Sequence, residues 1–133
     1  MAAPLYAVQQ AIFTVLTGDS TLSGKVQGVL DNVPDEQAFP YIVIGAAVAT
    51  PDDTHDHEGW QIVCPIDTWS QARGNKEVES IQADLDRLLH HQVLPVSGAT
   101  WIYSRCDYAE PIRDPDGITR HMNARYRIWV QVP

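Results

Sequence analysis

From Met122 to Val130 the chain alternates strictly between two kinds of residue. One set of alternate positions is apolar: Met122, Ala124, Tyr126, Ile128 and Val130. The intervening positions hold Asn123, Arg125, Arg127, Trp129 and Gln131. Successive side chains of a β-strand point to opposite faces of its sheet, so this pattern predicts a strand with one buried face. The other face carries arginine and tryptophan, a combination typical of a protein interface.

Two helices are predicted. The first opens at Pro4, which suits an initial helical turn, continues with apolar residues at helical spacing, and ends at Gly18. The second runs from Asn75 to Leu89. Its apolar stripe is Val78, Ile81, Leu85, Leu88 and Leu89. The residues expected to face water are Glu77, Glu79, Asp84, Asp86 and Arg87.

Four more segments are typical of strands: 26–33, 39–45, 60–69 and 100–110. The β-branched run in 39–45 predicts burial on both faces, and Pro65 indicates an edge strand or a bulge. Segment 46–58 is a polar loop or the tip of a long hairpin. Trp101, Tyr103 and Arg105 are expected to share one side of their strand.

The element order is therefore α-β-β-β-α-β-β. It predicts an α+β fold, with a largely antiparallel sheet and both helices packed on one face. The tetrapeptide Asp114-Pro115-Asp116-Gly117 predicts the turn before the last strand. The 133 residues suit a single domain covering 1–133.

The charge is negative overall and unevenly distributed. The net charge of −8 disfavours nucleic acid as a partner, because phosphate contacts require clustered Lys and Arg. Residues 1–60 hold eight acidic residues and one base, Lys25, whereas residues 101–133 hold five arginines. Such asymmetry suits head-to-tail association of identical subunits, and ordinary solvated surface is the alternative. No segment approaches the length of a membrane span, and no secretory signal opens the chain, so a soluble cytoplasmic product is expected.

Few residues suggest chemistry. The segment around His55 and His57 combines imidazoles with carboxylates, which bind divalent metals, but the pattern favours a solvated loop over a metal site. His90 and His91 follow the second helix, where a positive charge is favourable. Cys64 and Cys106 lie in predicted strands and are interpreted as buried thiols, with a catalytic cysteine as the alternative. No catalytic residue, metal ligand or cofactor is therefore assigned.

Four segments in order resemble the siphophage tail terminator or tail-completion family, found in phages, prophages and gene transfer agents. The first is the opening helix with Asp19-Ser20, followed by residues 29–34. The second is the strand 39–45, which follows the family's pattern of proline, aromatic residue, aliphatic run and glycine. The third is Trp69-Ser70, then Gly74 and the second helix. The fourth is 113–121, which leads into the final strand.

The resemblance implies a structural virion protein without enzymatic activity. Its relatives form a hexameric ring at the head-proximal end of the tail tube, where the ring ends tube polymerisation and presents the head-attachment surface. The implied partners are copies of this chain, the tail tube protein and a head-side connector or stopper. The implied location is the head–tail junction of a virion assembled in the bacterial cytoplasm. No membrane and no sequence-specific nucleic acid is expected as a partner.

Three alternatives remain open from the sequence. The chain is a head-side connector or stopper, a metal- or ligand-binding domain that uses the His55/His57 loop, or a dimeric regulatory module. The candidate contact residues for subunits or partners are Asp52, Asp53, His55, Asp56, His57, Glu58, Arg113, Arg120, Arg125, Arg127 and Trp129.

Overall fold

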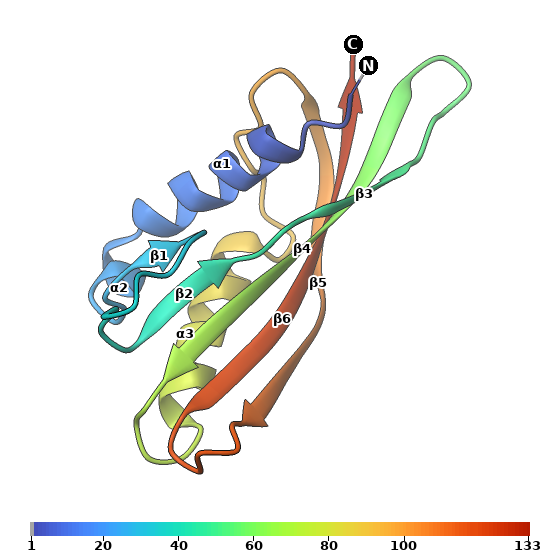
Figure 1. Cartoon of the computed structure of the whole chain (residues 1–133). Helices are drawn as coiled ribbons and strands as arrows, with labels where there is room; N and C mark the ends of the chain where they lie inside the picture. Colours follow the sequence, from blue (N-terminus) through green and yellow to red (C-terminus); the bar gives the residue numbers. More distant parts are fainter. Residues whose placement is uncertain (1) are drawn as a thin grey trace.

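The computed structural model describes residues 2–133 and contains one mixed sheet with helices on one of its faces (Figure 1). The helices are α1 (Leu5–Thr17), the short α2 (Ser20–Ser23) and α3 (Lys76–Leu89). The strands are β1 (Val29–Leu30), β2 (Tyr41–Ile44), β3 (Val48–Pro51), β4 (Glu58–Ser70), β5 (Thr100–Arg113) and β6 (Arg120–Val132). The α+β class predicted from the sequence is confirmed, with one more strand than the predicted order contained.

The strand order is β1-β2-β4-β6-β5, and β3 pairs with β4 beyond the end of β2. All pairings are antiparallel except that of β1 with β2, so the prediction of a largely antiparallel sheet is confirmed. The extra strand β3 belongs to segment 46–58, where the hairpin interpretation is right. This hairpin extends past the rest of the molecule (Figure 1).

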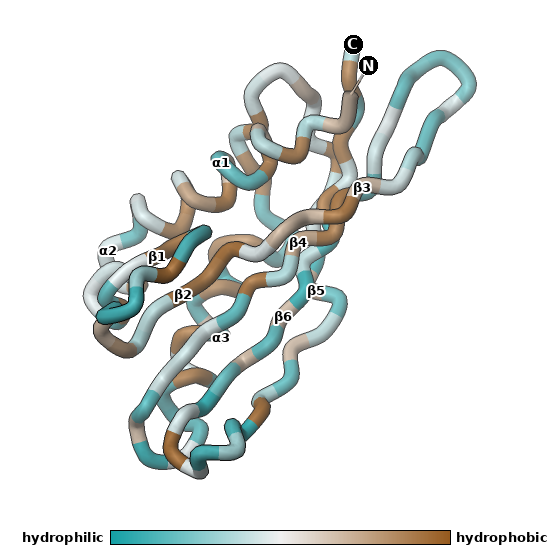
Figure 2. Tube along the Cα trace, viewed as in Figure 1, coloured by the Kyte–Doolittle hydropathy of each residue, from teal (hydrophilic) through white to brown (hydrophobic). Residues whose placement is uncertain are grey.

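The core lies between the sheet and helices α1 and α3. In β6 the residues from Met122 to Val132 alternate between buried and less buried positions, as predicted. The buried face meets a cluster that includes Ile12, Leu85 and Ile62. Figure 2 shows this layering as brown segments along α1, α3 and the strands, whereas the projecting hairpin is teal. Among residues 2–133, no helix covers the opposite face of the sheet.

Two predictions about strand environments are wrong, the second only in part. In β2, Ile42 and Ile44 are buried but Tyr41 and Val43 are only half-buried, because no helix covers the second face of the sheet. For Pro65 the edge alternative is wrong, since β4 lies between β2 and β6, but the bulge alternative fits, because the register against β4 shifts by one residue between the pairs Ile44–Ile66 and Val48–Val63. The proline is accommodated where the neighbouring strand changes from β2 to β3, and its carbonyl oxygen accepts from the Gly45 N–H at 2.8 Å.

Helix α3 confirms the predicted apolar stripe in part, but its acidic residues do not all face water. Asp84 is buried and forms an ion pair with Lys25 at 2.7 Å, which ties the segment after α2 to α3. The Tyr126 hydroxyl donates to Asp86 at 2.6 Å and accepts from Gln82 at 2.8 Å. These partners come from distant parts of the chain, which is why helical spacing alone assigned both carboxylates to the solvent.

Strand β5 departs from regular alternation. Irregularities at Ile102 and Asp107 shift its register against β6. As a result Trp101 pairs with Val130 on the core side, whereas Tyr103 pairs with Trp129 on the side without helices. The prediction that Trp101, Tyr103 and Arg105 share one side is therefore wrong for Trp101, since each extra residue reverses the alternation.

The turn between β5 and β6 follows the prediction. The Gly117 N–H donates to the Asp114 carbonyl oxygen at 3.0 Å, and Gly117 has a φ of +75°, which glycine adopts without strain. Asp116 accepts hydrogen bonds from the backbone N–H groups of Ile118 and Thr119, both at 2.8 Å. These bonds hold the pKa of the Asp116 carboxyl below its usual value.

Candidate protein interface

The predicted contact residues lie in three separate places. Asp52 to Glu58 form the end of the β3–β4 hairpin, called here the acidic tip. Arg125, Arg127 and Trp129 lie on the side of β6 that no helix covers, called here the open face. Arg113 and Arg120 pair with each other at the far ends of β5 and β6. Since β4 spans twelve residue steps between these ends, the tip and the arginine pair lie about 40 Å apart.

The acidic tip is an ordered turn. The Asp52 N–H donates to the Gly59 carbonyl oxygen at 2.8 Å, and the Gly59 N–H donates to the Asp53 carboxylate at 3.0 Å. A side chain at position 59 would collide with the Asp52 carbonyl oxygen, so the turn requires glycine there. The solvated segment predicted around His55 and His57 is therefore a hydrogen-bonded turn.

Charge at the tip is concentrated and exposed. His57 Nδ1 lies 3.1 Å from the Asp56 carboxylate, and this contact holds the pKa of Asp56 below its usual value. Residues 52–57 are all exposed. Among residues 2–133, no group of three or more His, Cys, Asp or Glu side chains has the geometry to hold a metal ion. What this turn offers is an acidic surface on a projecting arm.

The open face joins arginines to aromatic rings. Arg105 and Arg127 lie over the Trp129 ring, at 5.2 and 6.0 Å from its centroid. Both arginines form ion pairs with the Asp107 carboxylate, each at 2.9 Å. Asp107 lies at the second irregularity of β5. Burial opposes ionisation of Asp107, but the hydrogen bonds from the two arginines outweigh it, and its pKa lies below the usual value. The positive charge of this pair of arginines is therefore partly neutralised within the chain.

Sequence reasoning missed several residues that extend this network. The Tyr103 ring packs on Trp129 at 5.3 Å, and the Tyr103 hydroxyl lies 2.7 Å from His91 Nε2. His91 adopts a φ of +59°, which places its ring against both Tyr103 and His90. No sequence signal indicated this, because it depends on the irregularity in β5 that brings Tyr103 opposite Trp129.

A second cluster lies further along the open face. His121 stacks on Trp69 with ring centroids 4.0 Å apart, and His121 Nε2 contacts the Asp67 carboxylate at 2.8 Å. Arg125 lies 5.4 Å over the Tyr108 ring, and no carboxylate pairs with it among the described residues. An arginine without an acidic partner, beside exposed aromatic rings, has the composition expected of a contact surface.

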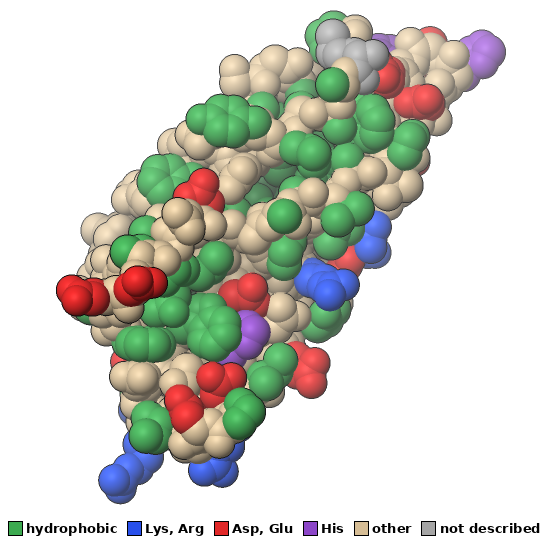
Figure 3. Space-filling view, viewed as in Figure 1, with side chains coloured by type: hydrophobic (Ala, Val, Ile, Leu, Met, Phe, Trp, Pro, Cys, Tyr) green, Lys and Arg blue, Asp and Glu red, His purple; other side chains and the backbone are tan. Residues whose placement is uncertain are grey.

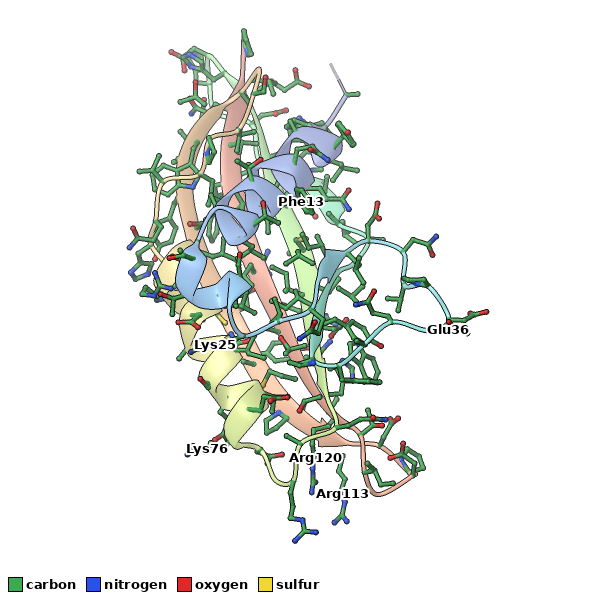
Figure 4. All side chains as sticks on the ribbon, turned by 90° about the vertical axis from the view of Figure 1, so that its left-hand side faces the viewer. Phe13, Lys25, Glu36, Lys76, Arg113 and Arg120 are labelled. Atoms are coloured by element: carbon green, nitrogen blue, oxygen red, sulfur yellow. The ribbon has the colours of Figure 1, made fainter. Side chains whose placement is uncertain are left out.

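Charged side chains gather at both ends of the molecule. Figure 3 shows acidic and histidine side chains at the end of the projecting hairpin, and blue side chains extending beside red ones at the opposite end. Figure 4 labels Lys76, Arg113 and Arg120 at that end. Arg73 lies in the turn just before α3, next to Lys76 in the same surface hollow. None of these four basic residues forms an ion pair among residues 2–133.

Neither of the two cysteines has a thiol with a lowered pKa. Cys64 is fully buried, and this burial raises its pKa to about 12. Cys106 is only partly buried, contrary to the prediction, because it lies on the strand at the sheet edge. Burial still raises the pKa of Cys106 to about 11. Since thiolates are the reactive form, neither side chain has the lowered pKa of a nucleophilic cysteine.

Taken together, the fold and these surfaces define a small α+β protein whose distinctive side chains lie on its exterior, on an open sheet face and a projecting arm. No helix among the described residues is long and apolar enough to cross a membrane. The chain belongs to the Tail completion protein gp17 family, whose model matches residues 10–131. This is a family of phage tail assembly proteins, and the resemblance seen in the sequence is confirmed.

Individual relatives agree with this assignment. The tail completion protein gp17 of Bacillus phage SPP1 is 27% identical over 124 residues, which cover 93% of this chain and 92% of that protein. Its solved structure matches with a TM-score of 0.67 at 25% identity, over 92% of this chain and 88% of that chain. A chain in the virion of a native gene transfer agent particle has the same fold, with a TM-score of 0.89 at 20% identity, over 98% and 99% of the two chains.

Proposed function

We propose that residues 1–133 act as one tail-terminator-like domain that forms a ring on the head-proximal end of a tail tube. The ring ends tube polymerisation and provides the surface to which the filled head attaches. The observation that carries this proposal is the family match over residues 10–131, together with a fold shared along 98% of the chain with a protein of a gene transfer agent virion. The proposed role is structural, without catalysis or a cofactor.

The proposed partners follow from this position. Copies of the chain form the ring, which we take to be hexameric on the family resemblance. The tail tube protein lies on one side of the ring, and a head-side connector or stopper lies on the other. The location is the head–tail junction of a virion assembled in the bacterial host cytoplasm. Neither a membrane nor a specific nucleic-acid sequence is a partner in this proposal.

The charge distribution supports a ring. A ring of identical subunits uses two different surfaces of each subunit, which must fit each other. Acidic residues of the first half and arginines of β5 and β6 offer two surfaces of opposite charge. We propose that the acidic tip and the open-face residues Arg125, Arg127 and Trp129 make contacts with neighbouring subunits or with the tube. Arg113 and Arg120 make such contacts from the opposite end.

The experiment removes the gene and measures the tails that the cells then make. Negative-stain electron microscopy is expected to show tubes longer than those of the parent particle, without heads attached. A plasmid copy of the gene should restore tail length and head attachment. Tails of normal length with unattached heads would contradict a terminator and indicate a head-side connector or stopper.

A further inference from the structure

Strand β5 is a free edge of the sheet. Over its fourteen residues, Thr100–Arg113, it pairs only with β6 in the described part of the chain. The backbone N–H and C=O groups on its other side therefore point away from the sheet. An unpaired strand of this length is a template for contact with a second chain unless the protein protects it.

Large apolar residues are exposed along this edge. Of the ten exposed large apolar residues in the described chain, four lie on β5: Ile102, Tyr103, Tyr108 and Ile112. Ile102 is 47% exposed at the strand irregularity, where it belongs to neither regular face. Exposed apolar residues gathered on one element mark an interaction surface, whereas scattered ones are ordinary.

The same edge is protected against unlimited pairing. Two irregularities interrupt its register, and Pro111 has no N–H to donate. Bulges and proline are features that prevent open-ended addition of strands. A partner on this edge must therefore fit its side chains in a defined position, as a subunit in a closed assembly does.

The opposite edge of the sheet is formed by β1 and β3. Val48 of β3 is 65% exposed, and the outer side of β3 has no strand partner among residues 2–133. The loop after β1 carries three exposed acids, Asp31, Asp35 and Glu36. Figure 4 labels Glu36 on this loop, away from the sheet. The acidic tip continues from the same edge, because it follows β3.

The two edges differ in charge. All eight acidic residues of the first sixty except Asp19 lie in the loop after β1 or in the acidic tip. Strand β5 carries two arginines, Arg105 and Arg113, and two acids, Asp107 and Glu110. Arg105 is paired with Asp107, whereas Arg113 forms no ion pair within the described chain. The acids of one edge can therefore attract Arg113 on the β5 edge of another copy, and such an attraction favours one orientation of the contact.

We propose that the subunit contact of the ring joins these two edges, with β5 of one copy lying along the β1–β3 edge of the next copy. This inference rests on the proposed ring and names the surfaces that close it. Across the sheet, Val48 pairs with Val63, Val63 pairs with Arg127, and Arg127 pairs with Arg105, so Val48 and Arg105 lie at the same level on opposite edges. If the strands run along the ring axis and neighbouring copies lie at the same height on that axis, Val48 of one copy faces the Ile102–Arg105 part of β5 in the next copy.

The experiment tests this contact with engineered cysteines. Val48→Cys and Ile102→Cys are combined in one chain in a Cys106→Ser background, since Cys64 is buried and does not react. Tails that contain this chain are purified and treated with a short thiol-to-thiol cross-linker. The expected result is a ladder of covalent oligomers on a denaturing gel, because each copy carries one thiol on each of the two edges.

Three controls make the result specific. Each single-cysteine variant has one thiol per contact and should give no ladder. A chain with Thr14→Cys on α1 and Glu79→Cys on α3 carries two exposed thiols away from both edges and should also give none. Circular dichroism of the purified variants, matched to the parent chain, verifies that the substitutions leave the fold intact.

The outcomes separate the two proposals. A ladder in the double variant alone supports the edge-to-edge contact. Tails of normal length with the chain at their end, but without a ladder, overturn this contact and leave the terminator role in place. Absence of the parent chain from the tail ends, at normal tail length, overturns the proposed function itself and the ring contact with it.

Discussion

The two faces of the sheet differ in what their side chains contact. On the side of α1 and α3, alternate residues of β6 such as Ile128 are almost completely buried. On the open face, the neighbouring residue Trp129 takes part in contacts with Tyr103 and two arginines and keeps part of its surface exposed. One strand thus supplies the core with one set of side chains and a contact surface with the other. Substitutions of neighbouring residues should accordingly have separable effects on stability and assembly.

The largest expected effect on stability comes from the buried face. Ile128→Ala removes packing inside the core, and the free energy of unfolding should fall by about 2–5 kcal/mol. Urea denaturation followed by circular dichroism measures this loss. The matched variant Trp129→Ala on the open face should lose clearly less stability while it impairs tail completion. An equal loss for both would contradict the division between the two faces.

A smaller loss of stability is expected when the Tyr126 hydroxyl is removed from the buried face. Tyr126→Phe removes the group that donates to Asp86 and accepts from Gln82. Because both partners are then left in a largely buried place without it, stability should fall by about 1–3 kcal/mol. Tyr108→Phe is the control on the open face, where water replaces the lost bond to Asn123, and its unfolding free energy should change by less than about 0.5 kcal/mol.

A substitution of Arg125 tests the open face without altering the core. Arg125→Glu alters an exposed residue that stacks on Tyr108 and forms no ion pair in the described part of the chain, so the free energy of unfolding should change by less than about 0.5 kcal/mol. Tail assembly should nevertheless fail in a complementation assay if the open face contacts a partner. The double variant Arg125→Glu/Arg127→Glu should fail more completely. Unchanged tail length and head attachment in the double variant would remove the open face from the interface.

The smallest expected effect is a loss of stability at low pH. The pKa of Asp107 is lowered in the folded chain, because the bonds from Arg127 and Arg105 outweigh the opposing effect of burial. The unfolded chain therefore binds this proton more readily, and the stabilisation is fully present well above the unfolded pKa of 3.8 and is lost as pH falls through the lower folded pKa. An NMR titration should give a pKa for Asp107 below 3.8, and Arg127→Gln should move it upward. No movement in the variant would contradict the contact.

The sequence predicted those features that depend on local pattern. The alternation of β6, the apolar stripe of α3 and the Asp114–Gly117 turn are all present, because spacing and turn residues determine them locally. Asp84 was misassigned to solvent, since its partner Lys25 is far away in the chain. Trp101 was assigned to the wrong side, since nothing in the alternation of 100–110 marks the irregularity at Ile102.

The candidate contact residues were selected by type and charge, and their positions relative to one another could not be predicted. Arginine next to tryptophan in β6 indicated an interface surface, and the structure places those residues on the open face. The sequence could not reveal that the acidic tip lies at one end of the molecule and Arg113 at the other, because this depends on the sheet order. The roles of Tyr103 and His91 also depend on contacts between separate elements.

The central claim is that this chain ends the growth of a tail tube, and polymerisation of the purified tube protein tests it most directly. Tube lengths are measured by electron microscopy with and without the chain, which is added after growth has started. The account predicts that tubes stop growing and carry the chain at one end, whereas Arg125→Glu/Arg127→Glu has little effect at the same concentration. Tubes that continue to grow at the same rate in the presence of the parent chain would contradict the account.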